Sequence, residues 1–156
     1  QRLSVAVARV KETGLPLIYV NQVGGQDELV FEGGSFVLNA DASLAVQFPA
    51  FAEAVVTTRW QRGAEGWHCE AGEIVPMMPQ DKSDYTACML GLRDYVGKNG
   101  FPGVVLGLSG GIDSALVAAI GVDALGPDRV RAVMLPYKFT SQESLDDAAA
   151  VANALG

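Results

Sequence analysis

The sequence predicts an α/β fold over the whole of its 156 residues. From residue 84 onward, helical stretches alternate with short apolar strands, a pattern that favours parallel strands joined by right-handed helical crossovers. The earlier residues predict one helix followed by a run of strands. Hydrophobic residues make up 49% of the chain, so there is enough apolar side chain to build a core.

The first segment opens with a predicted helix. Leu3, Val7 and Val10 recur at helical spacing, and Gly14 with Pro16 ends the pattern. Leu17–Val20 predicts a buried strand, and a polar, glycine-containing stretch follows it. The N-terminal residues therefore predict one helix followed by one strand.

A run of strands is predicted next. Gly33-Gly34 is interpreted as a hairpin turn, because glycine tolerates a positive φ. The strands that it would connect lie at residues 29–31 and 35–38, a second turn is predicted at 39–43, and further strands at 44–48 and 54–60. Residues 61–73 are polar and contain no predicted strand.

The best candidate for a domain boundary is Pro76-Met-Met-Pro79, which can continue neither a central strand nor a helix. We therefore expect two domain portions, residues 1–70 and 81–156, joined by a linker at 71–80. After the boundary the sequence predicts, in order, a helix at 84–98, a strand at 103–108, a Gly-rich turn at 109–114, a helix at 115–125 and a strand at 130–135. Ser144 and Asp147 resemble a capping box that would begin a final helix.

Composition excludes several functional classes. The net charge is −7 and the pI is about 4.5, so we expect no nucleic-acid partner. No apolar run approaches the ~18 residues of a spanning helix, so we expect no membrane partner. Only two cysteines occur and no secretory signal pattern opens the chain, which favours a cytoplasmic location.

The strongest chemical signal is Gly107-Leu-Ser-Gly-Gly-Ile-Asp-Ser114, between a predicted strand and a predicted helix. The paired glycines allow the backbone to approach a ligand, and the helix presents its positive end. The hydroxyls of Ser109 and Ser114 add donors. Such an arrangement is typical of a phosphate-binding loop at the carboxyl end of a parallel strand.

The residues that this loop lacks narrow its chemistry. No Lys follows the glycines, so the stretch is not the loop that supports γ-phosphoryl transfer. Asp113 occupies the turn instead. A carboxylate repels a polyphosphate unless a divalent cation lies between them, so the sequence implies Mg²⁺ held by Asp113.

Ser109-Gly-Gly-Ile-Asp-Ser114 resembles the pyrophosphate-binding SGGxDS loop of the N-type ATP pyrophosphatases. Two further stretches resemble the glutamine-dependent NAD synthetases within that superfamily. Val133-Met-Leu-Pro136 followed by Thr140–Ala148 is similar to their second strand and loop, and Tyr19–Ser35 is similar to the nitrilase-like glutaminase domain that precedes their synthetase domain. The resemblance implies the end of a nitrilase-like α-β-β-α sandwich, followed by the start of a doubly wound parallel adenine-nucleotide sheet.

The resemblance also implies a reaction: ATP-dependent amidation of deamido-NAD with ammonia from glutamine, through an adenylate. It implies that ATP phosphates are bound by Gly107, Leu108, Ser109, Gly110, Gly111, Ile112, Asp113 and Ser114. Ser141 and Ser144 are weaker candidates near the nucleotide, and for Ser144 a helix cap is an equal or better interpretation.

The family's Glu–Lys–Cys triad lies upstream of the Tyr19 motif, so we expect no glutaminase catalytic residue here. Cys69 is interpreted as a linker residue and Cys88 as a packed helix residue, neither being a nucleophile. We expect a fragment that spans the domain junction, is inactive alone and belongs to a homo-oligomer at full length. The alternatives are another SGGxDS amidotransferase, or an inert fragment that only binds nucleotide.

Overall fold

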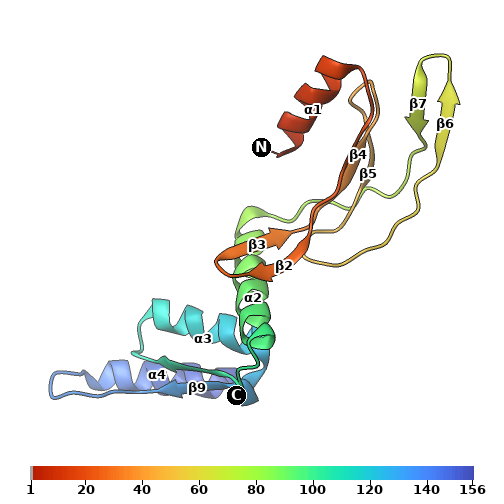
Figure 1. Ribbon diagram of the computed structural model, residues 1–156. Coiled ribbons are helices and arrows are strands. Elements are labelled where there is room, and N and C mark those ends of the chain that lie inside the picture. The colour runs from red at the N-terminus through yellow and green to blue at the C-terminus, as the bar shows by residue number, and fades with distance from the viewer. Residues whose placement is uncertain (1) are drawn as a thin grey trace. The chain divides into compact units, whose positions relative to one another are not determined.

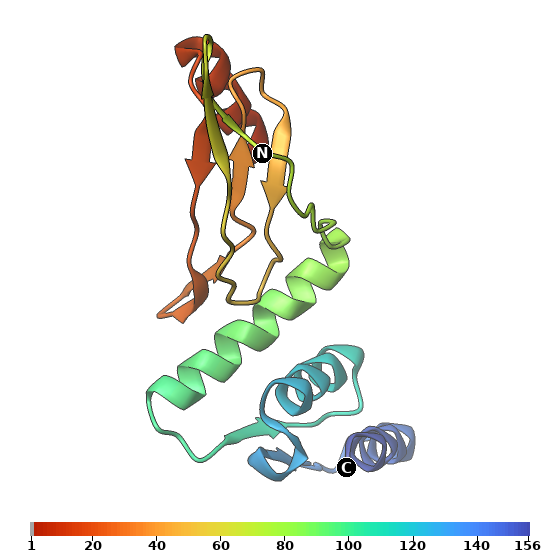
Figure 2. The ribbon, with the colours of Figure 1, turned by 90° about the vertical axis from the view of Figure 1, so that its right-hand side faces the viewer.

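The computed structural model describes residues 2–156, which divide into two compact units. The first unit contains the residues up to 24 and residues 31–83; the second contains residues 25–30 and 84–156. Figures 1 and 2 show their helices and strands from two directions. Among the described residues, none of the helices has both the length and the apolar character needed to cross a bilayer.

A helix and a three-stranded antiparallel sheet form the centre of the first unit (Figure 1). The helix α1 spans Arg2–Thr13 and ends where Gly14 adopts a φ of +66°, as the Gly14-Pro16 pattern predicts. The sheet has the order β1-β4-β5, and its strands cover Leu17–Tyr19, Phe36–Leu38 and Leu44–Gln47.

The central strand β4 has a core on each face, because successive side chains of a strand point to opposite sides. Phe36 and Leu38 pack with Ala6 and Val10 of α1. Val37 packs on the other face, in a cluster with Ala45, Val46 and Cys69. Cys69 belongs to a further hairpin, β6 (Trp60–Gly63) with β7 (Gly66–Cys69), so the unit has a helix, a sheet and a hairpin in three layers.

Several sequence predictions in this unit are wrong. The hairpin turn is not Gly33-Gly34 but Asp27 and Glu28, between β2 (Val23–Gln26) and β3 (Leu29–Glu32). Both glycines do adopt positive φ, yet they connect β3 to β4, which lie in different sheets. A Cβ on Gly33 would lie 2.6 Å from a Val23 methyl carbon, so close approach also requires glycine there.

Two other strand predictions fail for reasons of burial and composition. Residues 54–59 form no strand, and the hairpin of β6 and β7 lies instead inside the stretch interpreted as polar and irregular. Strand β1 is buried on one face only: Leu17 and Tyr19 pack against the core beside α1, whereas Ile18 is 57% exposed and Val20, which follows the strand, is 79% exposed. An apolar run alone does not show which side chains another element covers.

The second unit is built on two parallel strands with helices between and after them. Helix α2 spans Gln80–Lys98, four residues longer at its start than predicted. Strand β8 (Val104–Gly107) pairs in parallel with β9 (Val130–Val133), from Val104 opposite Val130 to Gly107 opposite Val133. Helix α3 (Ile112–Leu125) and the short 3-10 helix η1 (Pro127–Arg129) form the crossover, and α4 (Gln142–Leu155) follows β9. This confirms the predicted parallel pairing.

The tip of the β2–β3 hairpin, residues 25–30, packs on α2 within this second unit. The amide of Gly25 donates to Asp94 Oδ2 at 2.7 Å, and Lys98 Nζ donates to the Gly25 carbonyl oxygen at 2.5 Å. Lys98 also lies 3.4 Å from Asp94 Oδ2. A Cβ on Gly25 would lie 3.0 Å from the Cα of Gly91, so the backbones of the two segments meet closely.

Candidate phosphate-binding site

The predicted loop lies where β8 ends and α3 begins. Pairing with β9 continues one residue past β8, because the Leu108 amide donates to the Val133 carbonyl oxygen at 3.0 Å. The Leu108 side chain is buried with Ala118 and Ala148, so only its backbone faces the loop. The predicted turn is shorter than expected, since α3 already begins at Ile112.

Hydroxyl groups close the loop upon itself. The Ser109 amide donates to Ser114 Oγ at 3.2 Å, and the two serine oxygens lie 3.1 Å apart. Ser114 Oγ donates to the Gly111 carbonyl oxygen at 2.9 Å, and the Gly111 amide donates to Ser109 Oγ at 3.3 Å. The serines in this motif therefore fix the shape of the loop before any ligand binds.

The start of α3 supplies further donors. Gly111 is the N-cap residue and makes no side-chain cap, and the first intrahelical bond runs from the Ala115 amide to the Gly111 carbonyl oxygen. The amides of Ile112, Asp113 and Ser114 thus belong to the first turn, where helical N–H groups have no intrahelical acceptor. An anion at this end would meet those amides and the positive end of the helix dipole.

Gly110 brings the loop against the start of α4. Its φ is +80°, and a Cβ on this residue would lie only 2.3 Å from the Ser144 carbonyl oxygen. No other residue type fits both the backbone conformation and the contact. The glycine of the motif is therefore needed for packing as well as for approach to a ligand.

A cavity of about 480 Å³ lies beside the loop. It is lined by Gly107, Leu108, Ser109, Val133, Met134, Leu135, Pro136, Phe139, Thr140, Ser141, Ser144 and Leu145. The structure thus brings five of the candidate residues together around one hollow: Gly107, Leu108 and Ser109 from the loop, with Ser141 and Ser144 from the start of α4. Gly110, Gly111, Ile112, Asp113 and Ser114 follow in the chain but are not among the lining residues.

Ser141, rather than Ser144, caps α4. The Ser141 hydroxyl oxygen accepts a hydrogen bond from the Ser144 amide at 3.2 Å, and the two hydroxyl oxygens lie 2.9 Å apart. The capping box predicted for Ser144 and Asp147 is therefore wrong, because the helix starts three residues earlier than that box requires. Both hydroxyls still line the cavity.

Asp113 is exposed in the first turn of α3. Among residues 2–156 no group of three or more histidine, cysteine or acidic side chains is placed to hold a metal ion. Mg²⁺ commonly binds one or two carboxylates and takes its other ligands from water and substrate phosphates. A single exposed carboxylate beside a glycine-rich turn, as at Asp113, is compatible with that kind of site.

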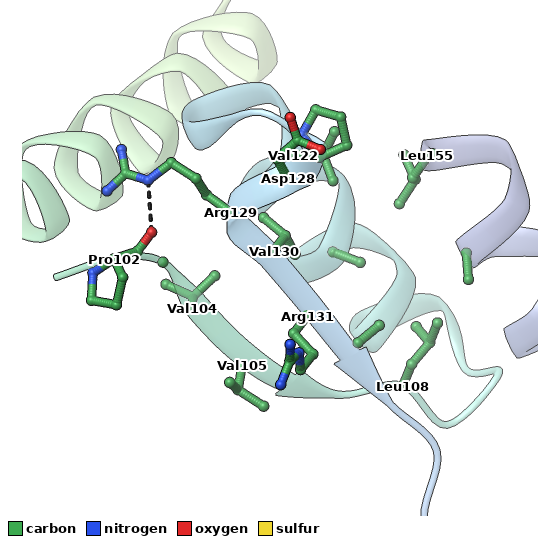
Figure 3. A pocket seen from close by; sticks show the side chains of 16 residues that line it. Pro102, Val104, Val105, Leu108, Val122, Asp128, Arg129, Val130, Arg131 and Leu155 are labelled. Carbon is green, nitrogen blue, oxygen red and sulfur yellow. Dashed lines mark hydrogen bonds between the residues drawn. The ribbon is translucent and has the colours of Figure 1, made fainter.

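A larger cavity, of about 620 Å³, is lined by residues of β8, β9, α3 and α4 (Figure 3). Of the candidate residues it contains Leu108 alone. Arg129 at its edge is occupied, because its guanidinium donates to the carbonyl oxygens of Pro102 and Phe101 at 2.9 and 2.8 Å. Its lining is mainly apolar, which makes it a poor site for an anion.

Neither cysteine has the surroundings of a nucleophile. Cys69 is fully buried in β7, and burial, followed by the charge of Glu70, raises the pKa of its thiol. A nucleophilic cysteine needs a lowered pKa. Asn39 holds the Cys69 backbone through hydrogen bonds to its amide and carbonyl at 2.8 and 3.2 Å. Cys69 is thus part of the core rather than a linker, whereas Cys88 is exposed and not packed as predicted.

Sequence reasoning missed the part of the cavity supplied by Leu135, Pro136, Phe139 and Thr140. A signal was present, since these residues follow the strand that pairs with β8, and the carboxyl ends of parallel strands share one edge of a sheet.

Two protein-family models match the chain in succession. The carbon-nitrogen hydrolase model matches residues 1–66, and the NAD synthase model matches residues 85–156. The glutamine-dependent NAD(+) synthetase of Rhodobacter capsulatus is 59% identical over 155 residues, and that of Acinetobacter baylyi is 44% identical over 146 residues. These alignments cover 99% and 94% of this chain.

Over nearly its whole length the chain is similar to a part of the glutamine-dependent NAD(+) synthetases. A solved structure of the synthetase from Acinetobacter baumannii, in complex with ADP, matches 99% of the chain with a TM-score of 0.91 and 45% identity. The synthetase structure from Cytophaga hutchinsonii matches with a TM-score of 0.69 at 16% identity, which shows a shared fold. The chain spans 28% and 27% of the two curated relatives and 29% of the Acinetobacter baumannii chain.

Proposed function

We propose that this chain is part of an enzyme that converts deamido-NAD to NAD, with ATP as the energy source and glutamine as the source of ammonia. Two findings support the proposal: both family models match one chain in the order expected for such an enzyme, and the close relatives carry that name. The single structural observation that carries it is the closed, glycine-containing loop between β8 and α3, beside a cavity.

The proposed reaction has two steps. The nicotinate carboxylate of deamido-NAD attacks the α-phosphorus of ATP; the bond to the bridging oxygen breaks, and pyrophosphate leaves with the electron pair. Ammonia then attacks the carbonyl carbon of the adenylate, the C–O bond breaks, and AMP leaves. The nitrogen loses a proton to become the amide of NAD.

The proposed role of this chain in the first step is to hold the phosphates. The Ile112, Asp113 and Ser114 amides at the start of α3 would donate to phosphate oxygens, and the Ser109 hydroxyl would join them by turning away from Ser114 Oγ. Because the other hydrogen bonds of these serines still fix the loop, the amides would need little reorganisation as charge develops on the leaving pyrophosphate, and such preorganised donors favour a transition state. The ADP in the Acinetobacter baumannii relative supports an adenine nucleotide as ligand.

Asp113 is the proposed protein ligand of Mg²⁺. When bound, the ion would offset phosphate charge that the amides leave unneutralised. Asp113, in the exposed first turn of α3, would hold the ion.

The ammonia would come from the nitrilase-like part of the longer protein. We propose that its catalytic triad lies outside these 156 residues, and that the longer protein is a homo-oligomer. The burial and raised pKa of Cys69 support the first point, because this cysteine of the first unit lacks the properties of a nucleophile.

Calorimetric titration of the chain with Mg·ATP tests the proposed ligand, with phosphorus NMR as a second readout. We expect saturable heat and shifts of the β- and γ-phosphorus lines. Ser109→Ala should weaken binding roughly tenfold, since a hydrogen bond to a charged group contributes on the order of 1.5–3 kcal/mol. Thr57→Ala removes an exposed hydroxyl in the other unit and serves as the control. Absence of heat and of shifts would contradict the proposal and favour an inert fragment.

A further inference from the structure

Two charged side chains of α2 hold the backbone of one residue in the β2–β3 hairpin. The Gly25 amide donates to Asp94 Oδ2 at 2.7 Å, and Lys98 Nζ donates to the carbonyl oxygen of the same glycine at 2.5 Å. Asp94 and Lys98 are four residues apart on the helix, so they share a face, and Lys98 Nζ lies 3.4 Å from Asp94 Oδ2. Each hydrogen bond to Gly25 therefore has one charged partner, and such bonds are stronger than bonds between neutral groups.

Glycines on both segments allow this close approach. A Cβ on Gly25 would lie 3.0 Å from the Cα of Gly91 and 3.3 Å from the Cβ of Asp94. A Cβ on Gly91 would lie 3.1 Å from a methyl carbon of Val30, on the second strand of the hairpin. The α2 surface around Gly91 thus fits an extended backbone with glycine at position 25, and the two charged groups bind its amide and carbonyl.

The hairpin itself contributes little to holding its tip in place. Strands β2 and β3 have four residues each and form a two-stranded sheet, and an isolated hairpin of this kind is only marginally stable in water. Near the tip, Leu29 and Val30 remain 58% and 38% exposed, so their burial stabilises the tip only weakly. The hydrogen bonds from α2 therefore carry most of the hold on residues 25–30.

These hydrogen bonds are accessible to water. The Lys98 side chain is 59% exposed and the Asp94 side chain is 19% exposed. Arg93 lies 3.8 Å from Asp94 Oδ1, so the carboxylate keeps a cationic neighbour when Gly25 leaves, and water can replace the glycine. Few buried apolar contacts and hydrogen bonds near solvent are the properties of segments that open locally while the rest of a protein stays folded.

We propose that Asp94 and Lys98 form a releasable clasp for residues 25–30, which open from α2 as a local unit at a frequency set by these two side chains. Gly25 lies in the stretch that matches the carbon-nitrogen hydrolase model, whereas Asp94 and Lys98 lie in the stretch that matches the NAD synthase model. The clasp therefore fastens one matched segment to the other, in addition to residues 67–84, which connect them along the chain. This inference does not rest on the proposed function, because no nucleotide takes part in it.

Amide hydrogen exchange of the intact 156-residue chain, followed by NMR, tests the clasp. Asp94→Ala removes the acceptor of the Gly25 amide, and Lys98→Met keeps an unbranched side chain but removes the ammonium. Lys11→Met is the matched control, because Lys11 also lies in the last turn of its helix. The amides of β4, in the core of the first unit, report whether the rest of the chain stays folded. Low concentrations of urea separate local from global opening, since urea favours states that expose more surface.

We expect exchange of the Gly25 amide in the original chain to be slow and to respond little to low urea. Asp94→Ala and Lys98→Met should each accelerate it at least roughly tenfold, as loss of a hydrogen bond to a charged group predicts, and leave the β4 amides unchanged. Lys11→Met should change it less than about twofold. Acceleration below about twofold in either clasp variant would overturn the inference. Equal acceleration at Gly25 and β4, in a variant or in low urea, would also overturn it, because the opening would then be global.

Discussion

Gly110 connects the loop to the helix that follows the next strand. Its positive φ and the nearby Ser144 carbonyl oxygen leave no room for a side chain. Gly107, in the same motif, has open space around the position of a Cβ and no positive φ. The structure thus requires glycine at position 110 but not at position 107, and substitutions at these two positions can be compared directly.

Gly110→Ala should destabilise the chain by about 1–3 kcal/mol from backbone strain alone, with a further cost from the contact with the Ser144 carbonyl. Gly107→Ala should change the free energy of unfolding by less than about 0.5 kcal/mol. Urea denaturation of both variants measures the difference. Equal stability of the two would show that the loop does not pack on α4 as described.

Tyr85 connects two helices of the second unit. Its hydroxyl donates to Asp123 Oδ2 at 2.6 Å, tying α2 to α3. That hydrogen bond, then partial burial and the charge of Asp123, raises the pKa of Tyr85 to about 12. The protonated phenol is therefore favoured in the folded state.

Because the folded pKa lies above the unfolded value of about 10, the contribution of Tyr85 to stability is fully present below about pH 10 and is lost as the pH rises through about 12. An absorbance titration of tyrosinate should show a late step from one of the four tyrosines. Tyr85→Phe should remove the late step, and Asp123→Asn should move it to lower pH. A late step that survives Tyr85→Phe would contradict the assignment.

At the scale of elements, helices were the most predictable part of the chain. Apolar spacing and a terminal glycine located α1, and the alternation after residue 84 predicted the parallel pairing of β8 with β9. The glycine-rich motif was placed between the correct strand and helix. These successes share a cause, since each signal is local and the structure satisfies it locally.

The errors arose where distant segments decide the outcome. Gly33-Gly34 has the conformational freedom of a hairpin turn, but its strands pair in different sheets. Cys69 lies in a polar stretch of sequence, but strand pairing places its side chain in the core beside Val37. The other residues that line the cavity with Ser109 were missed for the same reason, because they come from the segment after β9.

Either Ser141 or Ser144 could be assigned as the N-cap of α4, and substitution of each serine distinguishes the two assignments. Ser141→Ala should destabilise the chain by about 1 kcal/mol, the usual cost of losing a serine N-cap. Ser144→Ala keeps the backbone amide that donates to Ser141 and should cost clearly less. Thermal unfolding of the two variants compares them. A larger loss in Ser144→Ala would restore the capping box that begins at Ser144.

At the scale of the whole molecule, the chain joins a segment that matches the carbon-nitrogen hydrolase model to one that matches the NAD synthase model and contains the glycine-rich loop. Asp94 and Lys98 tie the hairpin tip to α2, whereas Cys69 lies in the core of the first unit. The first unit thus has a packed interior of its own, and the Cys69 side chain is buried within it.

We expect the 156-residue chain to release no ammonia from glutamine, and Cys69→Ala to leave that result unchanged. Cys69→Ala should instead lower stability by about 1 kcal/mol, because it removes a fully buried side-chain atom. An enzymatic ammonia assay and denaturation measure the two effects. Glutamine hydrolysis that disappears in Cys69→Ala would identify Cys69 as a nucleophile and refute the proposed location of the triad.

The contact between Gly25 and α2 joins two segments that are synthesised at different times. Asp94 follows Gly25 by 69 residues, so a growing polypeptide exposes the hairpin amide to water until α2 has emerged from the ribosome. The second unit begins with six residues synthesised before most of the first unit exists. A chimera that exchanged only the region after residue 80 with a distant homologue would therefore retain the hairpin of one parent against the helix of the other.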